Sequence, residues 1–287
     1  MSRQRKKTRR ESVERRSPGR PLLTGACLFA VALAGSAWAL WLSSGTDARE
    51  TQSAVRSLRS LRVSVLRTIP HETSAYTQGL VWHDSHLYES TGQYGESRLR
   101  QIDPRTGVVD QQISISPAFF GEGLALVGDN DLFMLTYQAE RGMVYDLETF
   151  DQIRTFRYRG EGWGLCYDGR RLIMSNGSDT LTFRDPSTFK EIGAVRVTLR
   201  GLPLTKLNEL ECVADRVYSN VYQDDAIVII DPSSGRVTHQ IDASGLLTPE
   251  ETRGTDVLNG IAYDPNTETF YITGKDWPKM FEVQFVG

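Results

Sequence analysis

The sequence predicts an all-β protein, a five-bladed β-propeller that is preceded by an N-terminal transmembrane or signal segment. Three observations support this fold class. From residue 60 onward the chain has strand-like apolar runs and no convincing helical period. A unit of about 40 to 50 residues recurs five times. An uncharged stretch of 22 residues precedes the first unit.

The five units are recognised by the way each one starts. A polar or aromatic position is followed by an apolar run, whose first residues are Leu80, Leu124, Leu165, Leu210 and Ile261. The intervals between them are 44, 41, 45 and 51 residues, the length of a four-stranded propeller blade. In the first unit we expect strands at Leu80–Trp82, His86–Ser90, Arg98–Ile102 and Val108–Ile115.

The fifth unit supplies only three expected strands, the last of them Lys279–Val286. An unassigned strand lies far away in the sequence, at Leu61–Ile69, where apolar and polar residues alternate. We expect this strand to complete the fifth unit and so to join the two ends of the body. Ring closure also removes free sheet edges, which otherwise promote aggregation.

The N-terminal part is divided by its charges. Residues 1–20 hold nine Lys or Arg and two Glu, a net +7, and form a basic cytoplasmic head. Residues 21–42 carry no charge and span about 33 Å as a helix, enough to cross a membrane. They are a transmembrane signal anchor or a signal peptide, and Ala37-Trp38-Ala39 fits a cleavage site. Residues 43–59 are a polar linker, and residues 60–287 are the propeller.

The charge and its placement also predict where the body works. Taking the +7 of the head from the total of −3 leaves −10 for the rest of the chain, which argues against a nucleic-acid partner. A basic flank keeps the N-terminus in the cytoplasm, so the body lies on the other side of the membrane. In a bacterium this is the periplasm, with an inner-membrane anchor if the segment at 21–42 is not cleaved.

The three cysteines give a weak signal. Cys27 lies in the apolar segment, whereas Cys166 and Cys212 each follow the start of a unit. The sequence leaves two alternatives open: Cys166 and Cys212 are separate small core residues, or they form a disulfide with each other. The chain has no CxxC motif and no histidine-rich cluster, so we expect no zinc site. The sequence also leaves open whether a structural calcium ion binds in the channel.

Because the first strand of each propeller blade lines the central channel, the five unit starts should converge at one end of it. Glu122 is the central candidate, since it lies between two glycines in Phe120-Gly121-Glu122-Gly123-Leu124. Taken alone, an aromatic residue at a strand start is usually packing and a loop glutamate is usually solvated. Convergence favours a small-molecule site. The unit starts contribute Tyr76, Gln78, Phe120, Glu122, Trp163, Asn208 and Asn259. The second strands add Tyr88-Glu89-Ser90, Thr136-Tyr137, Ser175-Asn176-Gly177, Asn220-Val221-Tyr222 and Thr273-Gly274-Lys275.

At these positions the chain resembles the glutaminyl-peptide cyclotransferases of the plant and bacterial type. The resemblance implies a five-bladed propeller that cyclises N-terminal glutamine to pyroglutamate and releases ammonia, with no metal or other cofactor. The matching stretches are Tyr76-Thr77-Gln78-Gly79-Leu80, Tyr88-Glu89-Ser90-Thr91-Gly92, Phe120-Gly121-Glu122-Gly123-Leu124, Glu161-Gly162-Trp163-Gly164-Leu165, Leu207-Asn208-Glu209-Leu210-Glu211, Leu258-Asn259-Gly260-Ile261-Ala262-Tyr263-Asp264 and Thr273-Gly274-Lys275.

The resemblance also implies roles for single residues. Glu122 is the catalytic carboxylate that shuttles a proton, and Glu89 is the second choice for that role. Tyr137 and Tyr222 stand where we expect the family to carry Trp, and Tyr76 where we expect Phe. The implied substrate-binding residues are Tyr76, Gln78, Phe120, Tyr137, Trp163, Asn208, Tyr222 and Lys275.

The implied partners are peptides or proteins that begin with glutamine, and we expect a monomer that binds no nucleic acid. Two other functions stay open at this point. One is a non-catalytic periplasmic propeller that binds a peptide or an envelope partner, because a fold alone does not determine function. The other is a metal-dependent hydrolase of the lactonase kind, which gathers several carboxylates on one cation.

Overall fold

The computed structural model describes residues 58–287, and all its regular elements are strands, which confirms the all-β class. The predicted basic head, the apolar segment at 21–42 and almost all of the linker lie outside the described residues. Within residues 58–287, no helix is long and apolar enough to span a membrane.

Three sheets are simple four-stranded meanders, in which each strand pairs with the next one along the chain. The first contains β2 (Thr77–His83), β3 (His86–Thr91), β4 (Arg98–Ile102) and β5 (Val109–Ser114). The second contains β6 (Gly121–Val127), β7 (Asp131–Thr136), β8 (Arg141–Asp146) and β9 (Gln152–Arg157). The third contains β10 (Leu165–Tyr167), β11 (Leu172–Met174), β12 (Thr180–Arg184) and β13 (Glu191–Arg196).

The remaining strands form one larger sheet in the order β16-β17-β18-β19-β1-β22-β21-β20. A short hairpin of β14 (Thr198–Leu199) and β15 (Leu202–Pro203), which we did not predict, pairs with β19. The strands of this sheet are β1 (Arg59–Pro70), β16 (Leu207–Val213), β17 (Arg216–Val221), β18 (Ala226–Asp231), β19 (Arg236–Asp242), β20 (Leu258–Asp264), β21 (Thr269–Gly274) and β22 (Lys279–Val286).

β1 joins the two ends of the described chain. It pairs antiparallel with β22 from Arg62↔Val286 to Pro70↔Lys279, and its first residues pair in parallel with β19. The predicted pairing of the strand at Leu61–Ile69 with the C-terminal strand is therefore confirmed. The four strands predicted for the first unit match β2 to β5 to within three residues at each end. They match because a two-residue alternation bounded by turns is a local signal.

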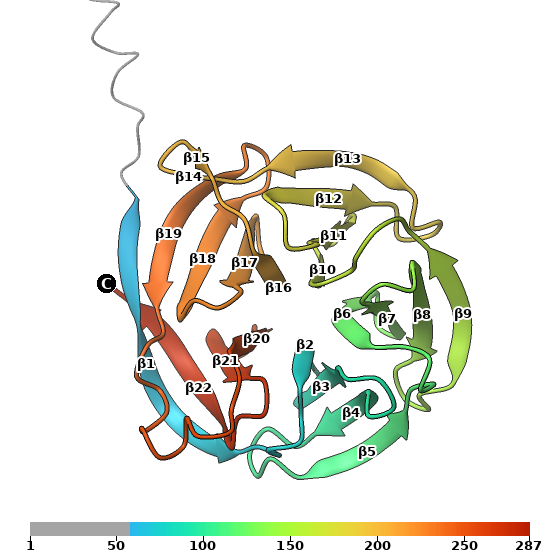
Figure 1. Ribbon diagram of the computed structural model, residues 1–287, viewed down its shortest axis with the longest axis horizontal. Helices are drawn as coiled ribbons and strands as arrows, with labels where there is room; N and C mark the ends of the chain where they lie inside the picture. Colours follow the sequence, from blue (N-terminus) through green and yellow to red (C-terminus); the bar gives the residue numbers. More distant parts are fainter. Residues whose placement is uncertain (1–57) are drawn as a thin grey trace, which may run out of the picture. The chain divides into compact units, whose positions relative to one another are not determined.

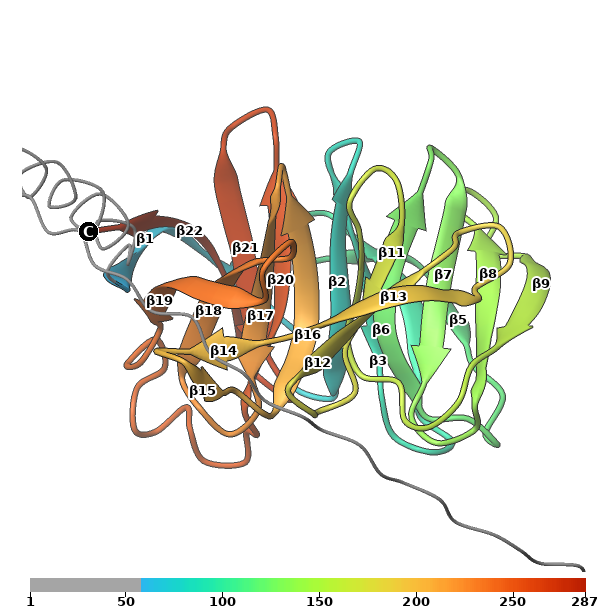
Figure 2. The same cartoon turned by 90° about the horizontal axis from the view of Figure 1, so that it is seen from above.

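The sheets are arranged around a common axis (Figure 1). The innermost strands are β2, β6, β10, β16 and β20, and they contact one another in a closed circle. Figure 2 shows that the inner strands run along this axis, whereas the outer strands are tilted by the twist of each sheet. The apolar core is divided into five clusters, each between two neighbouring groups of strands.

The inner strands approach one another so closely that some of their positions have room only for glycine. Gly123 in β6 donates its backbone N–H to the Trp163 carbonyl oxygen at 2.7 Å. A Cβ atom at Gly123 would lie 2.5 Å from that oxygen and 2.6 Å from the Leu165 nitrogen. A Cβ atom at Gly164 would overlap the Asn208 carbonyl oxygen in the same way. The glycines beside the candidate residues therefore let neighbouring backbones touch.

A disulfide adds a covalent link between two neighbouring groups of strands. Cys166 in β10 and Cys212 in β16 are bonded, which decides between the two alternatives left open by the sequence. The bond closes a stretch of 46 residues and so lowers the entropy of the unfolded chain.

Substitution of Gly123 by alanine should destabilise the fold, because the new methyl group meets rigid backbone rather than a mobile side chain. We expect a loss of about 1–3 kcal/mol or more in the free energy of unfolding, measured by urea denaturation. Gly193→Ala in the outer strand β13 is the control, because its nearest atom is a Phe183 ring carbon at 3.3 Å. Equal stability of the two variants would contradict the close-approach argument.

Candidate active site

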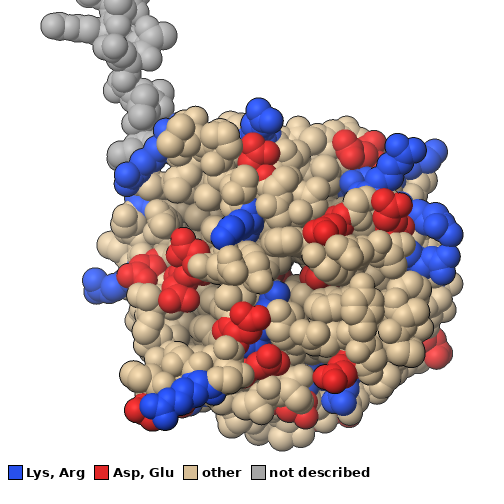
Figure 3. Space-filling view, viewed as in Figure 1, with Lys and Arg blue, Asp and Glu red and all other residues tan. Residues whose placement is uncertain are grey.

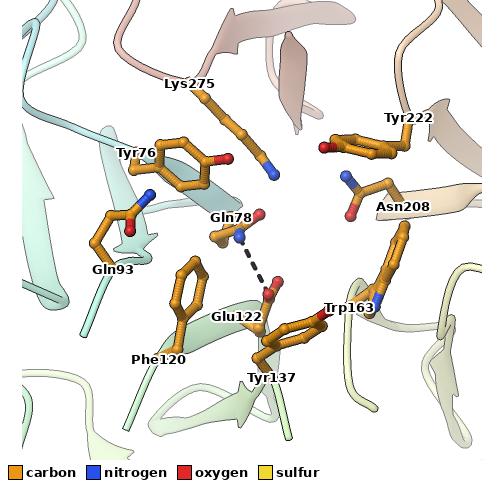
Figure 4. Close-up of a pocket in the computed structure, with 10 residues that line it drawn as sticks. All are labelled: Tyr76, Gln78, Gln93, Phe120, Glu122, Tyr137, Trp163, Asn208, Tyr222 and Lys275. Atoms are coloured by element: carbon orange, nitrogen blue, oxygen red, sulfur yellow. Dashed lines mark hydrogen bonds between the residues drawn. The ribbon is translucent and has the colours of Figure 1, made fainter. Parts of the chain in front are cut away.

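A cavity of about 260 Å³ opens at one end of the axis. Figure 3 shows this face, with an opening near its centre. The structure brings together all nine site residues that the resemblance implied, and their roles stay predictions. The lining residues are Tyr76, Gln78, Gln93, Phe120, Glu122, Tyr137, Trp163, Asn208, Tyr222 and Lys275 (Figure 4).

Two kinds of position supply these side chains. Gln78, Glu122 and Asn208 lie at the starts of the inner strands β2, β6 and β16. The residues Tyr137, Tyr222 and Lys275 come directly after the second strands β7, β17 and β21. Since the first and second strands of a meander are antiparallel, the start of one and the end of the other meet at the same face. The antiparallel order of the strands therefore brings these two sets of side chains together at one face.

Glu122 is buried, with only 4% of its surface exposed. Gln78 Nε2 donates a hydrogen bond to Glu122 Oε1 at 3.1 Å, drawn as a dashed line in Figure 4. Burial raises the pKa of Glu122 well above its ordinary value; the nearby Lys275 ammonium opposes this shift and the Glu161 carboxylate adds to it. The carboxyl group is therefore suited to gain and lose a proton at a pH well above the range of an ordinary glutamate.

Residues beneath the cavity hold Gln78 and Glu122 in place. Asn259 Nδ2 donates to Gln78 Oε1 at 3.3 Å and to the Thr77 carbonyl oxygen at 3.0 Å. Ser90 Oγ donates to the Glu122 carbonyl oxygen at 2.6 Å. Asn259 is fully buried and does not line the cavity, so the expectation that it would reach the site was wrong. The same holds for the expected second-strand residues other than Tyr137, Tyr222 and Lys275. Asn259 instead supports Gln78, which does line the cavity.

Lys275 and Asn208 are buried polar groups that point into the cavity (Figure 4). Lys275 Nζ lies 4.7 Å from the centre of the Tyr76 ring and 5.3 Å from that of Tyr222. Burial lowers the pKa of Lys275, and the Glu122 carboxylate acts against this shift. Neither the Lys275 ammonium nor the Asn208 amide has a hydrogen bond to another described residue. Both donors face the cavity and are therefore available to a ligand there.

The walls are aromatic, and two of the tyrosine hydroxyls lie close to acidic side chains. The Phe120 ring packs against Tyr76 at 6.1 Å and against Tyr137 at 5.7 Å between centroids. Tyr76 donates its hydroxyl to Asp256 Oδ2 at 2.8 Å. Burial raises the pKa of Tyr137, and the nearby Glu161 carboxylate adds to this shift. At Tyr76 and Tyr137 the departures from Phe and Trp therefore keep a ring in the wall and add a hydroxyl close to an acidic side chain.

Comparison with known proteins identifies the family. A family model for glutamine cyclotransferases matches residues 36–285. The chain belongs to the glutamine cyclotransferase family. Over 233 residues it is 38% identical to a glutaminyl-peptide cyclotransferase from Arabidopsis thaliana, covering 79% of this chain and 72% of that protein. It is 37% identical to the glutaminyl cyclase of Myxococcus xanthus, whose crystal structure matches with a TM-score of 0.72 over 80% of this chain and 99% of that one.

Membership of an enzyme family sets aside the non-catalytic binding propeller. The lactonase-type alternative needs several carboxylates on one cation, and the described part of the chain contains no group of three His, Cys, Asp or Glu side chains that could hold a metal. The expected members of this cyclotransferase site are instead one buried carboxylate, two amides and one amine, given by Glu122, Gln78, Asn208 and Lys275.

Sequence reasoning missed Gln93, the tenth lining residue. It lies in the turn after β3 with a φ of 81°, a conformation that non-glycine residues rarely adopt. Its neighbour Tyr94 is exposed and packs edge-on against Phe120 at 5.5 Å. The family stretch Tyr88-Glu89-Ser90-Thr91-Gly92 ends one residue earlier, and a glycine at a strand end marks a turn. That turn was the available signal.

Glu89, the second choice for the proton shuttle, has a structural role. It does not line the cavity and is fully buried. Glu89 accepts hydrogen bonds from Thr77 Oγ1 at 2.6 Å and from Arg100 Nε at 2.9 Å, and it lies 3.0 Å from His71 Nε2. Burial by itself would raise the pKa of Glu89, but the Arg100 guanidinium and His71 outweigh it and lower the pKa. A carboxylate held ionised in this way is a weak base and so a poor acceptor for a substrate proton.

Replacement of the buried Arg100 by methionine should leave the Glu89 charge without its main partner. We expect a loss of about 3–5 kcal/mol in the free energy of unfolding at pH 7, because a buried charge is left uncompensated. Since the folded pKa of Glu89 is lowered, the stabilisation is present above the unfolded pKa of about 4.3 and is lost as the pH falls below it.

The control for this experiment is Arg98→Met on the same strand, because Arg98 has no side-chain ion pair with another residue of the described range. Its effect should stay within about 0.5 kcal/mol. Denaturant unfolding at pH 7 and at pH 4 measures both variants. If Arg100→Met were as mild as Arg98→Met, the assignment of Glu89 to a buried ion-pair network would be contradicted.

Proposed function

We propose that this site converts N-terminal glutamine to pyroglutamate with release of ammonia, without a metal, and with Glu122 as the proton shuttle. Family membership makes the chain a glutaminyl-peptide cyclotransferase. The observation that carries the finer proposal is the buried Glu122 carboxyl group of raised pKa, which shares one small cavity with two buried donors, Asn208 and Lys275.

The cavity provides the groups that a terminal glutamine requires. The substrate has a neutral α-amine to be activated and a γ-carboxamide whose oxygen becomes negative during attack. Glu122 is the acceptor for an amine proton. Gln78 already donates to Glu122, so Asn208 and Lys275 are the donors for the carboxamide oxygen. The rings of Phe120 and Trp163 enclose the methylene groups and exclude water.

The reaction balances with one carboxyl group. The α-nitrogen attacks the γ-carboxamide carbon, a C–N bond forms, and a proton passes from the nitrogen to the Glu122 carboxylate. The tetrahedral intermediate then breaks its bond to the amide nitrogen, which takes the proton from Glu122 and leaves as ammonia. Because the attack is intramolecular, the substrate itself supplies proximity. The protein supplies proton transfer and stabilisation of the oxyanion.

The fold that carries this site is proposed to be a five-bladed propeller, with its fifth blade completed by β1. The circle of five inner strands and the five apolar clusters between groups of strands support this interpretation. The large sheet is then two blades, β16–β19 and β20–β22 with β1, joined edge to edge by the parallel contact of β1 with β19.

We propose that the body works outside the cytoplasm, as the basic head and the apolar segment suggested. The disulfide between Cys166 and Cys212 supports this location, because disulfides persist in oxidising compartments and are rare in the cytosol. Anchoring through residues 21–42 and a monomeric state stay predictions.

Glu122→Gln should abolish most of the activity while leaving the shape of the cavity unchanged. We expect kcat for ammonia release from Gln-Xaa dipeptides and longer Gln peptides to fall by about 10²–10⁴, because the variant cannot carry a proton. The measurement uses the full-length chain, with and without EDTA. Turnover by the chelated wild type supports a metal-independent site.

Two results would overturn parts of the proposal. Absence of turnover by the wild type on all Gln peptides contradicts the activity, and loss of turnover with EDTA contradicts metal independence. An active Glu122→Gln variant would remove Glu122 from the proton-transfer step. Correct folding of the variant is checked by its thermal unfolding midpoint.

The pH dependence of the wild type follows from Glu122. The carboxyl group must be ionised to accept the amine proton, so kcat/KM should fall as the pH decreases through its raised pKa. We therefore expect the acidic limb of the profile to lie well above the range in which an ordinary glutamate titrates. An acidic limb at or below about pH 4.5 would show that burial does not raise the pKa of the catalytic base.

A further inference from the structure

Glu161 lies at the edge of the cavity without lining it, between Gly160 and Gly162 in the segment before β10. Its Oε2 atom accepts a hydrogen bond from the Trp163 indole Nε1 at 3.0 Å. Its Oε1 atom accepts one from Gln138 Nε2 at 2.9 Å. One carboxylate thus connects the segment that precedes β10 with the segment that follows β7.

The orientation of the Trp163 wall depends on this carboxylate. One side of the indole rests on Gly177, where a Cβ atom would lie 2.7 Å from the ring and where φ is 77°. The edge of the ring meets Tyr222 at 5.6 Å and 80°. These contacts are apolar and leave the polar edge of the indole to be fixed by its hydrogen bond to Glu161. The hydrogen bond therefore selects one orientation of the ring.

Glu161 also acts on the reacting group through its charge. It is a second negative charge near Glu122, and it raises the pKa of Glu122 in addition to the larger effect of burial. Burial and the Glu161 carboxylate together raise the pKa of Tyr137. Lys275 acts on Glu122 in the opposite direction.

We propose that Glu161 is a positioning residue for the cyclisation, which fixes the Trp163 wall and places a second negative charge beside Glu122. This inference rests on the proposed function. Glu161 does not touch the reacting atoms in our scheme. It makes the orientation of the Trp163 ring and the proton affinity of Glu122 depend on one side chain.

The other charged and titratable groups around the pair are few. Lys275, Tyr137 and Tyr158 interact electrostatically with Glu122. Glu140 approaches the Glu161 segment from the neighbouring turn, where its Oε1 accepts the Gly160 N–H at 2.8 Å. Glu140 is exposed and does not line the cavity, so it provides a matched carboxylate outside the site.

Two substitutions separate the charge of Glu161 from its hydrogen bond. Glu161→Gln keeps an oxygen that can accept the indole N–H, and it removes the charge. We expect its KM for a Gln peptide to stay within about twofold of wild type. Its acidic limb should move to lower pH. At the pH where wild type retains a tenth of its maximal kcat/KM, the variant should retain a fraction about threefold larger.

Glu161→Ala removes the hydrogen bond as well. We expect the same movement of the acidic limb and, in addition, a rise in KM of about 3–10-fold, because the Trp163 wall loses its polar anchor. Glu161→Asp should restore the charge and keep the limb near that of wild type. Glu140→Gln is the control and should change neither KM nor the limb.

All variants are made in the full-length chain, and thermal unfolding midpoints confirm that they fold. The proposal is overturned if Glu161→Gln and Glu161→Ala keep the acidic limb of wild type, or if Glu140→Gln moves it equally. If Glu161→Ala failed to fold, the comparison of Glu161→Gln with Glu161→Asp would still decide whether the charge matters. Inactive wild type contradicts the proposed function instead, so the two failures are distinguishable.

Discussion

The close approach of the inner strands around the axis is the constraint on which the rest of the structure depends. At Gly123 a neighbouring carbonyl oxygen occupies the space of a side chain, and the backbone N–H of the same residue is bonded to that oxygen. Glu122 precedes this contact, so its position is set by backbone rather than by a flexible loop. The side chain of Glu122 consequently points into a cavity that is lined from all five groups of strands.

Burial and charge then divide the acidic residues near the axis into two classes. Glu89 is buried beside Arg100 and His71, and its pKa is lowered, so it holds strands together as an ion. Glu122 is equally buried but has only the opposing influences of Lys275 and Glu161, and its pKa is raised. The two carboxylates belong to neighbouring sheets, Glu89 to β3 and Glu122 to β6. Their different partners explain why one is structural and the other is suited to proton transfer.

The sequence was informative where a signal repeats. Five similar starts, one per unit, predicted the strands of the first unit and the pairing of the distant strand β1 with β22. Gln93 was not predictable in this way, because a single turn with a positive φ places it in the cavity. The proposed role of Glu161 was also hidden, since its hydrogen bond with Gln138 arises only when two units pack together. Local periodicity predicts strands, and tertiary packing decides which polar side chains meet.

The most direct test of the account is a titration of the Glu122 carboxyl group itself. Glutamate labelled with ¹³C at the carboxyl carbon would be followed by NMR across the pH range, and the resonance missing in Glu122→Gln would assign Glu122. We predict a midpoint well above that of an ordinary glutamate, because the cavity is poorly hydrated. A midpoint in the ordinary range would contradict the central claim that burial prepares this carboxyl group to carry the proton.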